Sequence, residues 1–187
     1  MYKIAAIIGE AGSGKDTIIN QSLLQHPEIF HKIINYTSRP KRENEIEGSD
    51  YYFVDEQTII NKIFDRQMLE VHSNVWLYGT SYGELSEEKI NIGVFTPYVL
   101  RKFLVGYPEF DLQIFRLKVS DKERLIRQLS REQNPNVKEI IRRFGTDLTD
   151  FENLNFEFIE LDNEGSGSIA AAIDQILAAF GQKTENN

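Results

Sequence analysis

The chain has 187 residues, with 21 basic and 29 acidic side chains, which gives a formal net charge of −8. A chain of this length buries roughly 70% of the surface that its unfolded form exposes, so it can build a full hydrophobic core. The sequence has no cysteine and three histidines, which excludes disulfides, thiolate nucleophiles and cysteine-bound zinc, and disfavours a histidine-built metal site. The acidic total argues against sequence-independent binding to nucleic acid. No apolar run is long enough for a signal peptide or a membrane span, so we expect a cytoplasmic protein.

Strand and helix patterns alternate along the chain, which is typical of an α/β fold with a mainly parallel sheet. The apolar, β-branched residues 2–8 predict a buried strand, and a helix is expected from residue 15 to about residue 26. Further strands are expected at residues 33–34, 51–54, 68–71, 76–78, 90–95, 112–119 and 156–161. Further helices are expected at residues 56–65, 98–104, 121–131, 137–144 and 169–180, and residues 36–50 are expected to form a loop. We expect one domain over residues 1–181 and a flexible tail at 182–187.

Residues 9–17 fit the phosphate-binding pattern G-x-x-x-x-G-K-[ST] at every position but the last. They follow an expected strand and open an expected helix, where backbone N–H groups and the helix N-terminus attract phosphate. We therefore expect Lys15 to bridge the β- and γ-phosphates of ATP and to act in catalysis. The alternative, a glycine turn with a surface lysine, explains neither the three glycines nor both flanking elements. The expected ATP-binding residues are Gly9, Glu10, Ala11, Gly12, Ser13, Gly14, Lys15, Asp16 and Thr17.

Asp16 stands where this pattern usually has a hydroxyl that coordinates Mg²⁺. A carboxylate is also a hard oxygen ligand that Mg²⁺ accepts directly or through water. We expect Asp16 to help hold Mg²⁺, with Thr17 as an alternative oxygen. The equally supported alternative is that Asp16 only stabilises the helix N-terminus through the helix dipole.

Several separated motifs resemble, in the same order, the monophosphate-binding region of guanylate kinases. They are residues 35–42 (NYTSRPKR), 47–54 (EGSDYYFV), 69–70 (LE) and 78–81 (YGTS). The resemblance extends over most of the chain and implies a three-layer P-loop α/β fold with a mainly parallel five-stranded sheet. It also implies a core at residues 1–34 and 85–181, a small β-rich monophosphate-binding insertion at 35–84, and a helical lid at about 127–142 with its tip at 132–136.

The resemblance implies that two arginines and two tyrosines bind the acceptor phosphate. Arg39 and Arg42 are three residues apart in the expected loop. Two guanidinium groups together with the phenol hydroxyls of Tyr51 and Tyr78 suit a dianionic phosphate.

The resemblance also implies a guanine-binding set made of Asn35, Glu70 and Thr80. Glu70 stands where the family's carboxylate accepts hydrogen bonds from the base, and Thr80 stands where a hydroxyl meets it. Asn35 replaces a serine that is frequent in the family, and its amide can still donate to the base.

Arginines on the later helices match those of the family's lid. Phosphoryl transfer needs cations around the moving group and no protein nucleophile, so Arg127, Arg131 and Arg142 are expected to be catalytic. Arg124 and Arg143 are expected to face solvent. Residues 162–163 resemble the family's loop near adenine, and the histidines, which are His26, His31 and His72, are expected to have no special role.

The expected activity is ATP-dependent phosphorylation of a nucleoside monophosphate, with GMP or dGMP preferred and ATP and Mg²⁺ as cofactors. The strand at 90–95 (INIGVF) lacks the aspartates that the family carries there, which motivates the alternative of a deoxynucleoside monophosphate kinase with another base preference. A non-catalytic protein-binding module is the alternative from a different class, but such modules typically lack the phosphate loop. The expected partners are small nucleotides, without nucleic acid or membrane, and the chain is expected to be a monomer or a homodimer.

Overall fold

The computed structural model describes residues 1–43, 45–64, 68–73, 76–106, 110–131, 133–165 and 167–182. Its main sheet has five strands in the order β2-β7-β1-β8-β9, and every neighbouring pair is parallel. The expectation of an α/β fold with a five-stranded parallel sheet is therefore confirmed. The strands are β1 (Lys3–Ile8), β2 (Phe30–Lys32), β7 (Ile90–Val94), β8 (Asp111–Lys118) and β9 (Ile159–Asp162).

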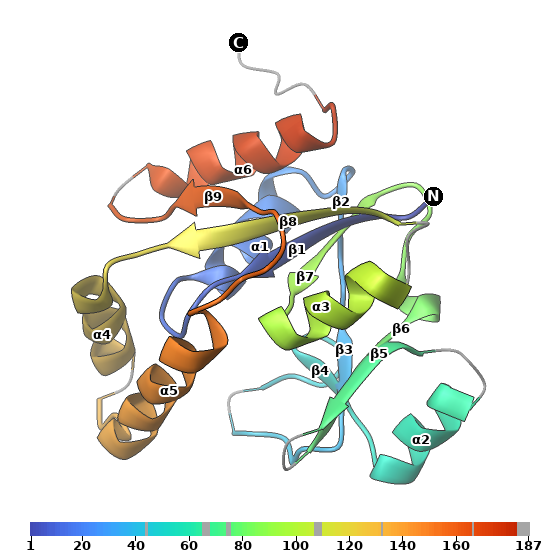
Figure 1. Ribbon diagram of the computed structural model, residues 1–187, viewed down its shortest axis with the longest axis horizontal. Coiled ribbons are helices and arrows are strands. Elements are labelled where there is room, and N and C mark those ends of the chain that lie inside the picture. The colour runs from blue at the N-terminus through green and yellow to red at the C-terminus, as the bar shows by residue number, and fades with distance from the viewer. Residues whose placement is uncertain are drawn as a thin grey trace.

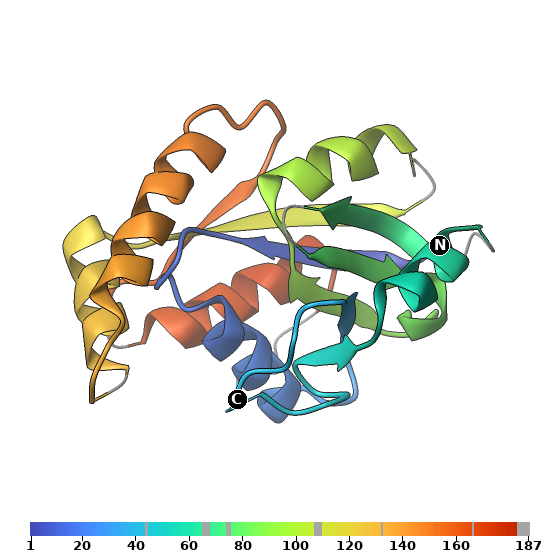
Figure 2. The same ribbon diagram turned by 90° about the horizontal axis from the view of Figure 1, so that it is seen from below.

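Helices cover both faces of this sheet, which gives three layers. Helices α1 and α6 lie on one face and α3 on the other (Figure 2). Helices α4 and α5 lie side by side beyond the carboxyl end of β8 (Figure 1). The bounds are α1 (Lys15–Gln25), α3 (Pro97–Gly106), α4 (Asp121–Ser130), α5 (Val137–Asp150) and α6 (Ser168–Ala179).

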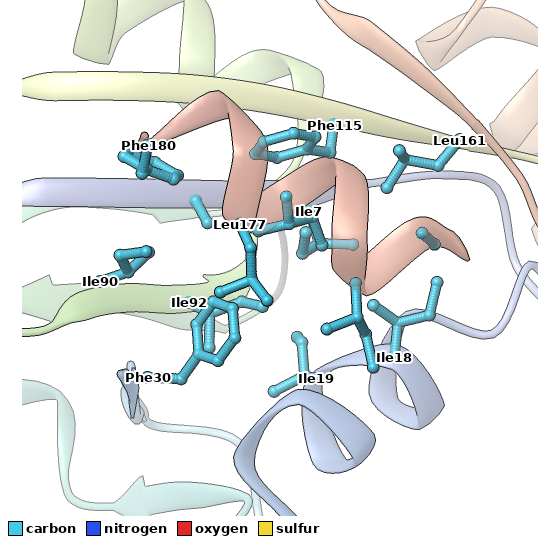
Figure 3. Packing of buried hydrophobic residues seen from close by; sticks show 14 of the residues in the cluster. Ile7, Ile18, Ile19, Phe30, Ile90, Ile92, Phe115, Leu161, Leu177 and Phe180 are labelled. Carbon is cyan, nitrogen blue, oxygen red and sulfur yellow. The ribbon is translucent and has the colours of Figure 1, made fainter. Parts of the chain in front are cut away.

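The central strand β1 explains why both faces must be covered. Its residues Ile4 to Ile8 are all 0% exposed, as expected for a continuous apolar strand in a parallel sheet. Because successive side chains alternate between faces, Ala5 and Ile7 pack with α1 and α6, whereas Ile4 and its alternate neighbours pack with α3. Figure 3 shows the first of these clusters, in which Ile7 of β1 packs together with Ile18 of α1 and Leu177 of α6.

A second sheet of four strands lies beside the core, in the order β4-β3-β6-β5. Strand β3 pairs with β4 in parallel and with β6 in antiparallel fashion, and β6 pairs antiparallel with β5. Tyr36 and Ile59 form its small core, and a helix, α2, packs against it. The bounds are β3 (Asn35–Thr37), β4 (Tyr51–Phe53), α2 (Glu56–Phe64), β5 (Met68–Ser73), β6 (Leu77–Ser81) and the short helix η1 (Tyr82–Glu84).

The structure corrects four expected boundaries. The expected strand at 33–34 is wrong, because the edge strand β2 ends at Lys32. Ile33 donates a single backbone hydrogen bond to Ile92 O (2.9 Å), and its side chain lies beside Gly93. The expected loop at 36–50 begins inside β3. The helix expected at 137–144 continues through Gly145 to Asp150, because a single glycine inside a helix costs only about 1 kcal/mol. The strand expected at 156–161 is shorter, since Phe156 and Phe158 pack against the α3 side of the core outside the strand ladder.

Two expected ends fall partly outside the described residues. These are residue 65 of the second helix and residues 183–187 of the tail. Within the described part of the chain, no helix combines the length and the apolar composition that a membrane crossing needs.

Candidate functional site

The phosphate loop connects β1 to α1 at the carboxyl edge of the main sheet, which is where ligands of open α/β folds bind. Gly12 and Gly14 have φ angles of 84° and 92°, in the left-handed region that glycine adopts without strain. A Cβ atom on Gly12 would lie 2.6 Å from Arg124 O, and one on Gly14 would lie 2.6 Å from Asn163 Nδ2. The loop is therefore pressed against α4 and against the segment after β9, and only glycine fits at these two positions.

The loop residues suit a nucleotide phosphate. Lys15 Nζ donates to Gly9 O (2.6 Å) and Glu10 O (3.1 Å), and burial lowers the pKa of Lys15, partly offset by Asp16 and other nearby carboxylates. Helix α1 starts after Gly14, which has no side chain to cap the first N–H groups. Ser13 Oγ is buried and makes no hydrogen bond to any described residue. A phosphate group would satisfy these donors, so the loop fits the group that its sequence implies.

Two adjoining clefts open beside this loop. The phosphate-loop cleft, of about 720 Å³, lies between Gly9–Thr17, the end of β7 and the helices α4 and α5. The arginine cleft, of about 700 Å³, lies between α1, the small sheet and the segment 39–51. Five residues line both clefts, namely Asp16, Tyr51, Val94, Arg131 and Arg143.

Asp16 lies where the two clefts meet, whereas Thr17 lines the phosphate-loop cleft alone. Among the described residues, no three or more His, Asp or Glu side chains are grouped so that they could hold a metal ion. A single carboxylate matches Mg²⁺, which keeps several waters and takes further oxygens from substrate phosphates. The donor set at Asp16 therefore fits Mg²⁺ bound together with a nucleotide.

The arginine cleft contains the expected phosphate-binding side chains Arg39, Arg42, Tyr51 and Tyr78. Arg39 is 9% exposed, and its guanidinium carbon lies 5.5 Å from the centre of the Tyr51 ring. The Tyr51 and Tyr78 rings meet edge to face with their centres 6.0 Å apart. Burial raises the pKa of Tyr51, so its hydroxyl stays protonated and can donate. Within the described residues the Arg42 guanidinium forms no ion pair.

Glu45, which the sequence did not single out, fixes the orientation of Arg39. Its carboxylate accepts two hydrogen bonds from the guanidinium, Nη2 to Oε1 at 2.7 Å and Nη1 to Oε2 at 3.0 Å, and a third from the Arg42 amide at 2.8 Å. Burial opposes the charged form of both groups, but these hydrogen bonds prevail and raise the pKa of Arg39 while lowering that of Glu45. Arg39 Nη1 also donates to Pro40 O (2.7 Å), and the Arg39 side chain forms a hydrogen bond with the Tyr78 side chain.

A smaller pocket of about 250 Å³ continues inward from Tyr51 and Tyr78 toward β7 and α3. Asn35 and Thr80, which were expected to contact a base, both line it. Thr80 Oγ1 donates to Asn35 Oδ1 at 2.6 Å, so the Asn35 amide nitrogen is left to donate. Glu70 pairs in register with Thr80 on the neighbouring strand, and its side chain lies outside the described part of the structure.

The three expected lid arginines all line the phosphate-loop cleft. Arg127 donates to Asn163 O (2.9 Å) and to Glu123 (2.9 Å), and Arg142 makes two hydrogen bonds to Glu139 (2.7 and 2.9 Å). Arg131 has no salt-bridge partner in the described part of the chain. The hydrogen bonds from Arg142, followed by those from Arg143, lower the pKa of Glu139 to about 2.

The expectation that Arg124 faces solvent is wrong, whereas the Arg143 side chain is 37% exposed. Arg143 lines both clefts. Arg124 is 5% exposed and binds Ala11 O, Asp121 and Asp147. Neither Asp147 nor its contact with the phosphate loop was found from the sequence, because the partners lie far apart in the chain and the only local signal is the Asp121–Arg124 spacing of three on α4.

Asn163, in the segment that resembles the family's adenine loop, instead contacts the phosphate loop directly. It is 4% exposed, and its Nδ2 donates to Ser13 O at 2.7 Å. His31 contacts Glu84 O on the core side of the small sheet, and His26 lies beside Glu28. The His72 side chain lies outside the described part.

Comparison with known proteins identifies relatives along nearly the whole chain. The family model described as guanylate kinase matches residues 1–92, which include the phosphate loop and the small sheet. The chain is 28% identical over 185 residues to guanylate kinase 2, chloroplastic/mitochondrial, of Oryza sativa subsp. japonica, covering 92% of this chain and 61% of that protein. It is 29% identical over 171 residues to the guanylate kinase of Wigglesworthia glossinidia brevipalpis, covering 88% and 82%. The chain thus spans less than two thirds of the rice protein's length.

The fold agrees with a solved structure of the same kind. The crystal structure of guanylate kinase from Anaplasma phagocytophilum superposes with a TM-score of 0.67 at 21% identity, covering 98% of this chain and 87% of that one. The sequence matches show that the chain is similar to guanylate kinases, and the superposition shows that it shares their fold.

Proposed function

We propose that this protein transfers the terminal phosphoryl group of ATP to a nucleoside monophosphate, with GMP or dGMP as the preferred acceptor. The observation that carries the proposal is that a phosphate loop and a two-arginine, two-tyrosine cluster line adjoining clefts that share Asp16 and Arg131. Two phosphate-binding sites that meet suit transfer between two nucleotides, because the reaction depends on positioning and on charge around the moving group.

The donor side of the proposal uses the nine residues of the phosphate loop. Their backbone N–H groups and Lys15 bind the phosphates of ATP, and Lys15 stabilises the charge that develops between the β- and γ-phosphates. Asp16, with Thr17 as an alternative oxygen, is the residue proposed to hold Mg²⁺. Mg²⁺, when bound, neutralises phosphate charge.

The acceptor side places the monophosphate in the arginine cleft. Arg39 and Arg42 bind its oxygens together with the hydroxyls of Tyr51 and Tyr78. The base enters the inner pocket, where Asn35, Glu70 and Thr80 are the proposed contacts.

The helical lid, proposed at about residues 127–142, supplies the remaining charges. Arg131 is already without a salt-bridge partner in the described structure, so it is proposed to bind the transferred group directly. Arg127 and Arg142 are held by Asn163 and Glu139, and we propose that lid closure moves them onto the phosphates and excludes water. The proposed core is 1–34 and 85–181, and the proposed monophosphate-binding insertion is 35–84.

A coupled assay of ADP release with GMP, dGMP and the adenine and pyrimidine monophosphates tests the proposal. We expect the highest kcat/KM with GMP or dGMP, an absolute need for Mg²⁺, and loss of turnover in a Lys15→Met variant. Turnover of no monophosphate at all would contradict the kinase proposal and favour the protein-binding alternative. Sedimentation of the same sample distinguishes the monomer from the homodimer.

A second candidate, a deoxynucleoside monophosphate kinase with another base preference, is favoured by one observation. The end of β7 contributes Gly93, Val94, Phe95 and Thr96 to the clefts and no carboxylate. These four residues therefore offer no carboxylate that could accept hydrogen bonds from ribose hydroxyls or base amino groups. Strong turnover of a pyrimidine deoxynucleotide with none of GMP or dGMP would establish this candidate over the first.

A further inference from the structure

The tip of the phosphate loop is held from outside by two helices. Both backbone polar groups of Ala11 are bound by side chains: its N–H donates to Asp147 Oδ2 on α5 at 2.8 Å, and its carbonyl accepts from Arg124 Nε on α4 at 3.1 Å. Gln128, one turn after Arg124, donates to the same carbonyl at 3.3 Å. Residues 113 to 136 positions away in the sequence therefore fix the two peptide groups on either side of Ala11.

Arg124 is built into the protein interior and has a partner for each of its nitrogens. Besides Ala11 O, it donates from Nη1 to Asp121 and from Nη2 to Asp147, both at 2.7 Å. Its guanidinium carbon lies 4.4 Å from the centre of the Phe144 ring, which covers one face of the plane. A lysine cannot replace this arrangement, because a single ammonium lacks the planar fork.

Asp147 joins the two interactions, because the same oxygen Oδ2 accepts from Ala11 N–H and from Arg124 Nη2. Its side chain is 16% exposed and lines the phosphate-loop cleft. The α4 backbone also packs on the loop at Gly12, where no Cβ fits. The loop tip, α4 and α5 therefore form one hydrogen-bonded unit centred on the Arg124–Asp147 pair.

We propose that Arg124 and Asp147 are positioning residues that hold the phosphate loop in its nucleotide-binding conformation and couple it to the helices that carry Arg127, Arg131 and Arg142. The inference rests on the proposed function, since it assigns the pair to the donor nucleotide. Neither side chain needs to touch ATP. Their effect is transmitted through the two peptide groups on either side of Ala11, so donor affinity depends on the pair and acceptor affinity does not.

Titration calorimetry with ADP and, separately, with GMP tests the pair. The variants are Asp147→Asn, which keeps an acceptor oxygen but loses the charge, Asp147→Glu, Arg124→Met and the double variant Arg124→Met/Asp147→Asn. Arg101→Met is the matched control, because Arg101 on α3 binds Asn155 and the Asn153 carbonyl and does not contact the loop. Thermal unfolding of each variant identifies the temperature range in which it is folded.

We expect Asp147→Asn and Arg124→Met to weaken ADP binding at least tenfold and to change GMP binding by less than twofold. The double variant is expected to bind ADP with about the same affinity as the single variant that binds ADP less tightly, because the two residues act as one unit. In kinetics, KM for ATP rises while KM for GMP stays constant, and the Arg101→Met control changes neither.

Two results overturn the inference. One is unchanged ADP affinity in folded Asp147→Asn and Asp147→Glu protein, which remain informative even if Arg124→Met does not fold. The other is an equal loss of ADP and GMP affinity that follows the loss of thermal stability, as a purely structural pair would give. If the unmodified protein binds neither ADP nor GMP, the proposed function fails together with the inference, which distinguishes that outcome from failure of the inference alone.

Discussion

Replacing Glu45 by Gln tests how the acceptor arginine is held. Glu45 accepts two hydrogen bonds from Arg39 and one from the Arg42 amide, and the side chains of Glu45 and Arg39 are 16% and 9% exposed. Glutamine has nearly the same shape. It keeps one oxygen, presents an NH₂ group to a guanidinium N–H, and removes the negative charge.

The size of the effect follows from these contacts. A hydrogen bond to a charged group contributes about 1.5–3 kcal/mol, and a neutral one about 1 kcal/mol. Losing one of the two Arg39 bonds and weakening the other removes about 2 kcal/mol. If that loss appears in acceptor binding, KM for the monophosphate rises about 20- to 30-fold, because each 1.4 kcal/mol is a factor of ten.

The assay measures KM for GMP and for ATP in the same coupled reaction, and urea unfolding reports stability. We expect KM for GMP to rise while KM for ATP stays within twofold, because Glu45 lines only the arginine cleft of the two. Glu47→Gln is the control, since Glu47 is on the same segment and, among the described residues, its carboxylate accepts only from the Phe53 amide. A folded Glu45→Gln protein with an unchanged KM for GMP would refute the argument that Glu45 orients Arg39.

Three further predictions concern the loop and the lid. Lys15→Met should lower kcat by roughly 100-fold or more, because it removes the loop's cation from the phosphates. The turnover assay measures this loss, and circular dichroism should show that the protein stays folded. Asp16→Asn should raise the Mg²⁺ concentration for half-maximal activity several-fold, and an unchanged requirement would support the helix-dipole role instead. Glu139 has a pKa of about 2 in the folded protein against 4.5 ordinarily, so its bonds to Arg142 and Arg143 stabilise the fold above about pH 4.5 and are lost as the pH falls toward 2. Glu139→Gln should therefore lower the free energy of unfolding by no more than about 1 kcal/mol at pH 7, since the group is one-third exposed, and by nothing near pH 2, measured by urea titration.

The parts of the fold that local sequence determines were predicted closely. A continuous apolar run defines β1, and the glycines and Lys15 place the loop and the start of α1, because these signals depend on neighbours in the chain. The edge strand β2 was misplaced by a few residues, since its position is set by pairing with β7, whose partner residues lie 60 positions later. Short strands of three residues carry too few side chains for a period to be visible.

Candidate site residues that a motif carries lie together in the structure, whereas contacts that only a distant partner explains were missed from the sequence. The Arg39 and Arg42 pair, Tyr51 and Tyr78 line one cleft, as the resemblance implied. Arg124 was placed on the wrong face, because the ordinary rule puts charge outside and apolar residues inside. On α4 the reverse holds: Arg124 is 5% exposed while Ile126 and Leu129 are 46% and 43% exposed.

The two buried arginine–carboxylate pairs explain how an acidic chain can present sites for phosphate. Removing a guanidinium from water is unfavourable unless a carboxylate pairs with it, and Glu45 and Asp147 do so for Arg39 and Arg124. A carboxylate that binds a guanidinium group fixes the orientation of that group. In the Asp147–Arg124 pair it also fixes the loop backbone that both side chains bind. The acidic residues beside these clefts thus help to orient the cations. The net charge of −8 is compatible with the two proposed phosphate sites, because each depends on the local field and on directed donors.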